Sequence, residues 1–295
     1  MPLFFVIICG KKTLHLSNVF QYTREHEKNI VITIVAAGLL FVLTSGNLNK
    51  VYSAESDVER IGIISAMDNE IGVLLKEADI NHEDMIGGVK YYIGKLRGKD
   101  VVITRAGIGK VRASSGVTAM FNKYNISKVL FTGIAGGVAD ETQILDEVVA
   151  TRLVEHDYGI ISNDGFMWVS GDPGISREAG EYYYCDKELV ELAYNASVAT
   201  VGKEHVFKGT IATGDQFIAS EVYVERLKKE YNALACEMEG ASVAVICIKY
   251  EKPFVVIRAL SDKADGKANS NYQNFGDIAG ANSSQIILKM LESIK

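Results

Sequence analysis

The sequence predicts an α/β protein built as a single three-layer αβα domain around a central mixed, twisted sheet. From residue 61 onward, short apolar stretches typical of strands alternate with stretches of helical spacing, a pattern that favours a sheet with helices on both faces. The chain has 27 glycines, concentrated in its middle, where tight strand-to-helix turns are expected. With 295 residues, 48% of them hydrophobic, the chain can bury one full core.

The predicted elements follow one another without an internal repeat or a proline-rich linker. The apolar stretch IGIISAM at 61–67 predicts the first strand, and a helix is expected at 68–76. Further strands are expected at 91–96, 101–104, 128–132, 147–154, 205–211, 233–236 and 254–260, the first two as a hairpin. Further helices are expected at 109–124, 187–199, 221–231, 240–250 and 277–294.

The folded domain is expected to span residues 56–295, and residues 1–55 are expected to be a signal peptide or a membrane anchor. The run IVITIVAAGLLFVLTS at 30–45 carries no charge. It is longer than most signal-peptide cores and slightly short for a membrane-spanning helix. A buried core helix is a poorer interpretation, because the run precedes the first strand of what is already a complete domain.

Val51 and Ser53 suit the −3 and −1 positions of a signal-peptidase site, which makes a cleaved signal peptide the first interpretation and an uncleaved anchor the second. The protein is then expected to be exported, periplasmic or otherwise extracytoplasmic, or to be held at a membrane through residues 30–45. A wrongly assigned start codon is the alternative, and it would make the protein cytoplasmic.

Composition argues against two classes of partner. The net charge is −6 and no basic patch stands out, so nucleic acid is not expected as a partner. The four cysteines form no CxxC pair, and no metal-ligand spacing is present in the chain, so no metal site is expected.

Four groups of polar or glycine residues follow predicted strands, at 68–70, 133–137, 237–239 and 258–262. Ligands of open α/β sheets bind beyond the carboxyl ends of the strands, so these groups are expected to meet in one site. Within them, the stretches ACEMEG and VVIRALSD place carboxylates at the edge of a core, where each needs a hydrogen-bonding partner. The two stretches together indicate a polyol-binding site with an acid beside it.

Glu239 and Asp262 carry the most specific chemistry in these stretches. Glu239 can accept two hydrogen bonds from vicinal hydroxyls. Asp262 can be a general acid if its surroundings raise its pKa. The competing interpretation of Asp262 is a helix cap or a partner of Arg258 or Lys263.

The other candidates are weaker when each is taken alone. Phe217 can stack on a planar ligand, although a core phenylalanine is the commoner role. Glu70 can simply be a first-turn acid that the helix dipole favours. The glycine-rich turns expected at 107–110 and 132–137 match neither a Walker A loop nor GxGxxG, and they can cradle an anion or let backbone approach a flat base.

In this order and spacing, GIISAMDNEI, RAGIGKVRA, TGIAGG, TGDQFI, CEMEGAS and FVVIRALSD resemble the motifs of the 5′-methylthioadenosine/S-adenosylhomocysteine nucleosidases. That family belongs to the purine nucleoside phosphorylase and uridine phosphorylase superfamily. The resemblance runs from about residue 60 to the carboxyl terminus.

The resemblance implies catalytic roles for Glu70, which would activate water, and for Asp262, which would protonate the purine at N7. Arg258 would help to hold the attacking water, and Ser261 would support the acid. It also implies that Glu239 binds the ribose hydroxyls. The other substrate-binding residues that it implies are Phe217 stacked on adenine, Ile218 at the adenine edge, Met238 against the sugar, and Ala135 and Gly136.

The resemblance implies hydrolysis of the N-glycosidic bond of 5′-methylthioadenosine and S-adenosylhomocysteine, with no cofactor. It further implies a homodimer in which the interface completes the pocket for the 5′ substituent. The alternatives are a phosphorolytic nucleoside phosphorylase and an exported nucleosidase-like binding protein.

The chain departs from the family pattern in two places. Ile134 stands where the family often has a hydroxyl residue, and the segment after His156 and Asp157 is longer than usual. Glu237 is assigned no role beyond structure.

Overall fold

The computed structural model describes residues 58–168 and 182–294, and residues 56–295 form one compact unit. The centre of this unit is a mixed sheet of ten strands, counted over the described residues. Their order is β11 (Ala233–Glu237), β10 (Val206–Thr213), β6 (Glu147–Glu155), β12 (Phe254–Asp262), β5 (Ile126–Gly137), β1 (Arg60–Ser65), β4 (Lys99–Arg105), β3 (Val89–Leu96) and β2 (Asp79–Ile86), with β9 (Tyr183–Tyr184) paired to β6.

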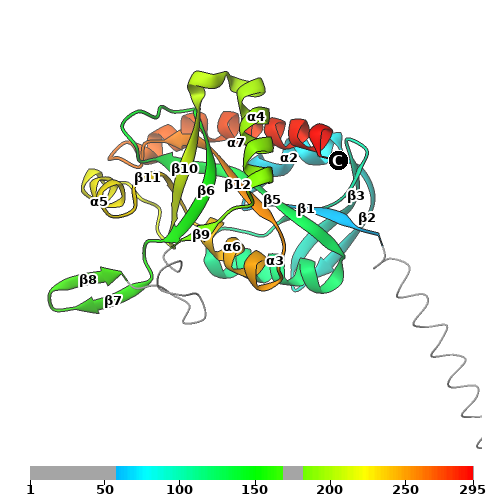
Figure 1. Cartoon of the computed structure of the whole chain (residues 1–295), viewed down its shortest axis with the longest axis horizontal. Coiled ribbons are helices and arrows are strands. Elements are labelled where there is room, and N and C mark those ends of the chain that lie inside the picture. The colour runs from blue at the N-terminus through cyan, green and yellow to red at the C-terminus, as the bar shows by residue number, and fades with distance from the viewer. Residues whose placement is uncertain (1–57, 169–181, 295) are drawn as a thin grey trace, which may run out of the picture. The chain divides into compact units, whose positions relative to one another are not determined.

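Helices cover both faces of this sheet, which confirms the predicted three-layer αβα fold (Figure 1). One face carries α2 (Asp68–Glu77), α4 (Lys187–Val201) and α7 (Ala268–Ser293), which pack on one another. The other face carries α3 (Lys110–Lys123) and α6 (Gly240–Lys249), while α5 (Glu221–Tyr231) packs against β10 and β11.

Part of the sheet closes on itself. β5 pairs in parallel with β12, β12 pairs antiparallel with β6, and β6 and β10 continue in parallel to β11. β11 then returns to β5 as an antiparallel neighbour, through Ala235 opposite Gly137 and Cys236 opposite Gly136. The carboxyl ends of β5, β11 and β12 therefore lie together.

The central strands are apolar along nearly their whole length because helices cover both of their faces. Every residue of β1 and β12 is buried. Burying such apolar side chains contributes about 25 cal/mol for each Å² removed from water. Towards its end, β12 also buries the polar side chains of Arg258, Ser261 and Asp262.

The stretch 133–137 is a strand rather than the predicted glycine-rich turn. β5 continues through Gly137 because both β12 and β11 pair with its end. Its glycines let side chains come close to the strand backbone. A Cβ atom on Gly133 would lie 2.7 Å from Glu70 Oε1, and one on Gly136 would lie 2.9 Å from Asp262 Oδ1. The glycines therefore leave space for two predicted catalytic side chains.

Three elements differ from the sequence expectation. β2 was not predicted because its residues alternate between exposed and half-buried positions and none is buried. The closing helix α7 begins at Ala268 instead of at 277, because its first turns are polar and lack an apolar stripe. The stretch after His156, expected to be a loop, forms a hairpin of β7 (Gly159–Ser162) and β8 (Gly165–Trp168).

The uncharged run at 30–45 lies outside the described residues, so its expected role as a signal peptide or anchor stays a prediction. In the part of the chain that the structure describes, no helix combines the length and the apolarity needed to span a membrane.

Candidate active site

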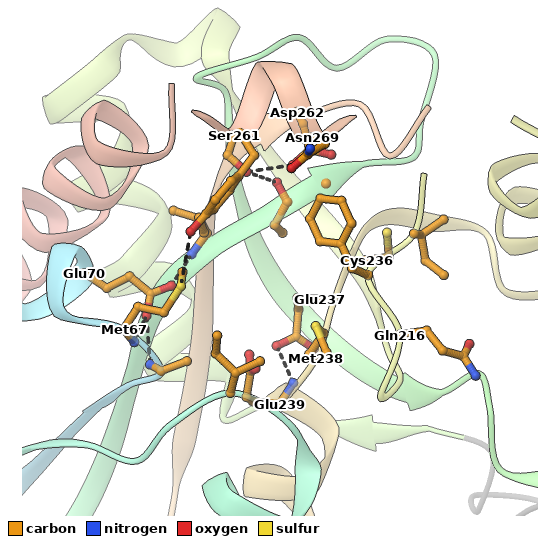
Figure 2. Close-up of a pocket in the computed structure, with 18 residues that line it drawn as sticks. Met67, Glu70, Gln216, Cys236, Glu237, Met238, Glu239, Ser261, Asp262 and Asn269 are labelled. Atoms are coloured by element: carbon orange, nitrogen blue, oxygen red, sulfur yellow. Dashed lines mark hydrogen bonds between the residues drawn. The ribbon is translucent and has the colours of Figure 1, made fainter. Parts of the chain in front are cut away.

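A cavity of about 340 Å³ opens where the carboxyl ends of β5, β11 and β12 meet (Figure 2). The starts of α2 and α7 and the loop after β10 complete its wall. The sequence-predicted site residues that line it are Glu70, Ala135, Gly136, Phe217, Ile218, Met238, Glu239, Ser261 and Asp262. Arg258 alone of the predicted set does not line it. The motifs that lie far apart in the sequence thus form one site.

Glu70 lies in the first turn of α2 and is only 2% exposed. Its Oε2 accepts hydrogen bonds from the backbone N–H groups of Ala66 and Met67, each at 2.8 Å, and its Oε1 accepts one from Ile134 at 3.0 Å. Glu70 therefore caps its own helix, as the simpler interpretation held, and also presents its carboxyl group to the cavity. Burial raises the pKa of Glu70, and the Arg258 charge and these three bonds oppose the rise.

Ile134, which departs from the family pattern, contributes its backbone as well as its side chain. Its N–H holds the Glu70 carboxylate, while its apolar side chain lies on the cavity wall. The position of Glu70 is therefore secured by backbone N–H groups, without a side-chain hydroxyl at residue 134.

Arg258 is the largest fully buried side chain of the described residues, and its charge is neutralised by Glu237. Its Nη2 lies 2.6 Å from Glu237 Oε2 and 3.7 Å from Glu239 Oε2. Arg258 is thus not the partner of Asp262, which had been one interpretation of that aspartate. It influences the cavity indirectly: it holds Glu237 in place, and its charge opposes the rise in the pKa of Glu70.

Glu237, which the sequence left without a role, is the centre of this buried network. Its Oε2 also accepts hydrogen bonds from the N–H groups of Glu239 and Gly240, at 3.1 and 2.7 Å. Its Oε1 accepts a bond from the hydroxyl of Thr213. Glu237 therefore joins the ends of β10, β11 and β12, and its need for partners at the core edge is met within the protein.

Glu239 is the N-cap of α6 and lines the cavity. The residue is only 6% exposed. Its Oε1 accepts a hydrogen bond of 2.9 Å from the Gly109 N–H. Burial and the neighbouring Glu237 carboxylate raise the pKa of Glu239 to about 8. Its second oxygen receives no hydrogen bond from the described residues and is available for a ligand hydroxyl.

Asp262 ends β12 and is 2% exposed. Its Oδ2 accepts a hydrogen bond of 2.8 Å from the Ser261 hydroxyl, and its Oδ1 accepts one of 2.8 Å from the Ala264 N–H. Burial raises the pKa of Asp262, against the effect of both bonds. A carboxyl group with a raised pKa beside a cavity is suited to donate a proton.

Opposite these acids, the wall of the cavity is largely apolar. Phe217 is 52% exposed and stands edge to face with Tyr272, with ring centroids 6.3 Å apart. An exposed aromatic face beside a buried acid suits a planar, protonatable base. Sequence reasoning missed Met67, Ile108, Gln216, Asn269 and Tyr272, which also line the cavity. The last two lie on the unpredicted first turns of α7.

Lys110 ties the loop that carries Phe217 to the Glu239 region. Its backbone N–H donates to Asp215 at 2.8 Å, and its side chain bridges Glu155 and Asp157 at 3.1 and 2.8 Å. The neighbouring Gly109 N–H donates to Glu239. The start of α3 therefore holds both the loop that carries Phe217 and the carboxyl group of Glu239. Spacing alone does not reveal these bonds.

The described residues contain no group of three or more histidine, cysteine, aspartate or glutamate side chains arranged to hold a metal ion. The polar groups on the cavity wall are carboxyl groups, hydroxyls and amides, which form hydrogen bonds with hydroxyl groups and base edges.

The fold and this site define a protein of a known class. A family model described as the phosphorylase superfamily matches residues 60–292, so the chain belongs to that superfamily. Over 236 residues the chain is 36% identical to the 5′-methylthioadenosine/S-adenosylhomocysteine nucleosidase of Shewanella sediminis, covering 80% of this chain and all of that protein. It is 34% identical to the Aeromonas salmonicida enzyme of the same name, covering 79% and 98%. Within the superfamily, the chain therefore belongs to the family of these nucleosidases.

Solved structures agree with this placement. The nucleosidase of Neisseria meningitidis in complex with methylthio-immucillin-A matches with a TM-score of 0.72 and 31% identity, over 80% of this chain and 99% of that one. A futalosine hydrolase of Helicobacter pylori matches with a TM-score of 0.71 and 32% identity, over 80% and 99%.

Proposed function

We propose that the chain hydrolyses the N-glycosidic bond of 5′-methylthioadenosine and S-adenosylhomocysteine, releasing adenine and the corresponding thioribose. One observation carries the choice of hydrolysis: no lysine, arginine or histidine is among the described residues that line the cavity, while four carboxyl groups are. Such a wall offers a phosphate dianion no cationic side chain to bind it, whereas it can accept neutral water. The membership of the nucleosidase family supports the same choice.

In the proposed reaction, the adenine stacks on Phe217 and places N7 at Asp262, while Glu239 accepts hydrogen bonds from the ribose 2′ and 3′ hydroxyls. As the bond between C1′ and N9 breaks, positive charge grows on the ribose and the base gains the electron pair. Asp262 donates its proton to N7. Glu239 stabilises the cationic sugar through the hydroxyls that it binds.

Glu70 accepts a proton from water as the water oxygen bonds to C1′. The proton lost by Asp262 leaves on adenine, and the proton gained by Glu70 comes from water. Glu70 then releases its proton to solvent and Asp262 takes one up, so the net reaction consumes one water molecule. Each acid or base contributes about 10²- to 10⁴-fold to such a rate. An added Cβ atom on Gly133 would lie 2.7 Å from Glu70 Oε1 and 2.8 Å from Arg258 Nη1, so the guanidinium lies near this base, and its charge favours the ionised form.

The test is adenine release from 5′-methylthioadenosine, S-adenosylhomocysteine, adenosine and inosine, each with and without phosphate. We expect release from the two thio-substituted substrates without phosphate. A strict requirement for phosphate would replace this proposal by phosphorolysis. The binding-protein alternative predicts tight ligand binding with no release under either condition.

We further propose that the active form is a homodimer whose interface completes the pocket for the 5′ substituent. Exposed apolar side chains support this: Val111 on α3 is 79% exposed, and Ile161 and Met167 on the β7–β8 hairpin are 84% and 57% exposed. Sedimentation of the purified protein tests the dimer, and a monomer with full activity would rule it out.

For residues 1–55, the proposal is export with cleavage after Ser53, or retention at a membrane through 30–45. The uncharged run and the small residues before Ala54 support it. Amino-terminal sequencing of the protein recovered from fractionated cells tests it, since a cytosolic fraction with an intact terminus would contradict both forms.

A further inference from the structure

A second cavity of about 920 Å³ adjoins the candidate active site. The two cavities share Ala66, Met67 and Ile108 as lining residues. Through these shared residues, the second cavity continues the active site. The second cavity extends from there between α2, the turn joining β2 and β3, and the start of α3.

The second cavity differs from the active site in charge. Three cationic side chains line it, from Lys90, Arg105 and Arg112. Arg105 Nη1 lies 2.6 Å from Asp68 Oδ2. Lys90 Nζ lies 2.8 Å from Glu83 Oε2. These two cations are therefore already paired.

Arg112 has no carboxylate partner among the residues that the structure describes. Its Nη1 donates a hydrogen bond of 3.0 Å to the Ile108 carbonyl oxygen, at the junction of the two cavities. Its aliphatic stem lies against Gly107, where an added Cβ atom would come within 3.1 Å of Arg112 Cδ. Gly107 has a φ of +93°, so this approach depends on glycine. The guanidinium is thus held at the junction, with most of its five donors unused.

The proposed substrate pose directs its 5′ end toward this junction. The base occupies the region of Phe217 and Asp262, and the ribose occupies the region of Glu239 and Glu70. The lining residues that remain include Met67 and Ile108, where the cavity continues into the second one. A substituent on C5′ that is longer than the cavity must therefore extend past Ile108 toward Arg112.

We propose that Arg112 binds the α-carboxylate of an amino-acid 5′ substituent, such as the homocysteine group of S-adenosylhomocysteine. The ammonium group of the same substituent would face Asp68, whose side chain is 81% exposed and has one oxygen outside its bond to Arg105. The inference rests on the proposed function and adds to it a subsite for a zwitterion. The methylthio group has no charge and makes no use of this subsite.

The kinetic signature of this subsite follows from its distance from the reacting bond. The carboxylate contact is the same in the ground state and the transition state, so it lowers KM and leaves kcat unchanged. Because Arg112 is exposed, salt screens its attraction for the carboxylate. The preference for S-adenosylhomocysteine should therefore weaken as ionic strength rises.

The experiment compares the full chain with Arg112→Gln and Arg112→Lys on three substrates. These are 5′-methylthioadenosine, 5′-butylthioadenosine as an uncharged substituent of similar length, and S-adenosylhomocysteine. We expect Arg112→Gln to raise KM for S-adenosylhomocysteine about tenfold, with kcat unchanged and both uncharged substrates within twofold. Arg112→Lys should recover part of the loss, because it restores the charge without the bidentate geometry. Lys76→Gln, at an exposed cation that does not line the cavity, is the matched control.

Equal losses on all three substrates, or no loss on any, would overturn the inference. A fall in kcat for S-adenosylhomocysteine with KM unchanged would also overturn it, since it would place Arg112 in the chemistry. A wild-type chain that releases adenine from no substrate would instead refute the proposed function, so the two failures are distinct.

Discussion

Arg258 Nη2 lies 2.6 Å from Glu237 Oε2, and both side chains are almost fully buried beneath the cavity. The pair neutralises the charge of Arg258, which does not line the cavity. The described residues of the wall therefore include carboxyl groups and no cation, a lining that suits a cationic ribose better than a phosphate dianion. Glu237, which no ligand is proposed to touch, thus determines what the neighbouring residues can bind.

Replacing Glu237 by Gln should destabilise the protein, because it leaves the buried Arg258 charge without its main partner. We expect a loss of about 3 kcal/mol in the free energy of unfolding. Chemical denaturation of the variant and the wild type measures it. A change below about 1 kcal/mol, the value of an exposed pair, would show that Glu239 and Glu70 neutralise Arg258 unaided.

Replacing Glu70 by Gln should lower kcat for 5′-methylthioadenosine by about 10³-fold or more, because the amide cannot accept a proton from water. Substrate binding should change little, since Glu70 is not proposed to bind the nucleoside. Turnover and calorimetric binding measure the two effects separately. Glu141→Gln, at an exposed position, is the control, and full activity of the Glu70 variant would remove it as the base.

The pH profile of kcat/KM should have an acid limb and an alkaline limb, because Glu70 must be ionised and Asp262 must be protonated. Glu239, whose pKa is raised to about 8, also titrates within this profile. Activity should rise with pH through the pKa of Glu70, which burial moves above its ordinary value of 4.5. It should fall as pH rises through the pKa of Asp262, which burial moves above 3.8.

Ser261→Ala tests the assignment of the alkaline limb. The Ser261 hydroxyl donates to Asp262 and holds the pKa of that group down, so its removal should move the alkaline limb to higher pH. The acid limb should stay in place. If the acid limb moves instead, the assignment of the alkaline limb to Asp262 is wrong.

Replacing Glu239 by Ala should reduce discrimination between adenine ribosides and 2′-deoxyribosides by about tenfold, because the carboxylate is proposed to bind the 2′ hydroxyl. The ratio of the two kcat/KM values is the readout. It cancels any general loss of activity that follows from the altered helix cap, and an unchanged ratio would refute the assignment.

Replacing Glu147 by Leu should stabilise the protein. It is fully buried at the start of β6, and neither carboxyl oxygen has a hydrogen-bond partner within the described residues. Burial, with the adjacent Asp146 charge, raises the pKa of Glu147 well above 4.5. We expect Glu147→Leu to increase the free energy of unfolding by about 2 kcal/mol.

The sign of this effect depends on pH. A carboxyl group with a raised pKa favours the folded state below its unfolded pKa of about 4.5, and that contribution is lost as pH rises toward the folded value. The gain from Glu147→Leu should therefore be larger at pH 8 than at pH 5. Unfolding measured at both values checks this, and an equal gain would show that the group does not titrate differently in the two states.

The sequence sufficed for the fold class and for bringing the candidate side chains to one place, because strand ends and ordered motifs are local patterns. It did not reveal which acid pairs with Arg258. Asp262 was the predicted candidate, whereas the packing of β11 beside β5 places Glu237 against the guanidinium.

The missed parts of the site share a physical cause. Asn269 and Tyr272 lie on helical turns without an apolar stripe, so periodicity could not place them. Arg112 lies on a predicted helix, but its proposed role depends on a cavity that α2, α3 and the strands β2, β3 and β4 line together. Such cavities depend on tertiary packing, which hydrophobic patterns do not encode.

Helix α7 supports the proposed base from behind. The Ser284 hydroxyl donates to the Glu70 carbonyl, and Ser283 Oγ accepts a hydrogen bond of 3.1 Å from the Gly133 N–H. Both serines come after the last strand of the sheet in the sequence. They are therefore synthesised after Glu70, Glu239 and Asp262. A nascent chain that holds all three carboxyl groups still lacks the support that positions Glu70, and we expect its activity to begin only after α7 has been translated.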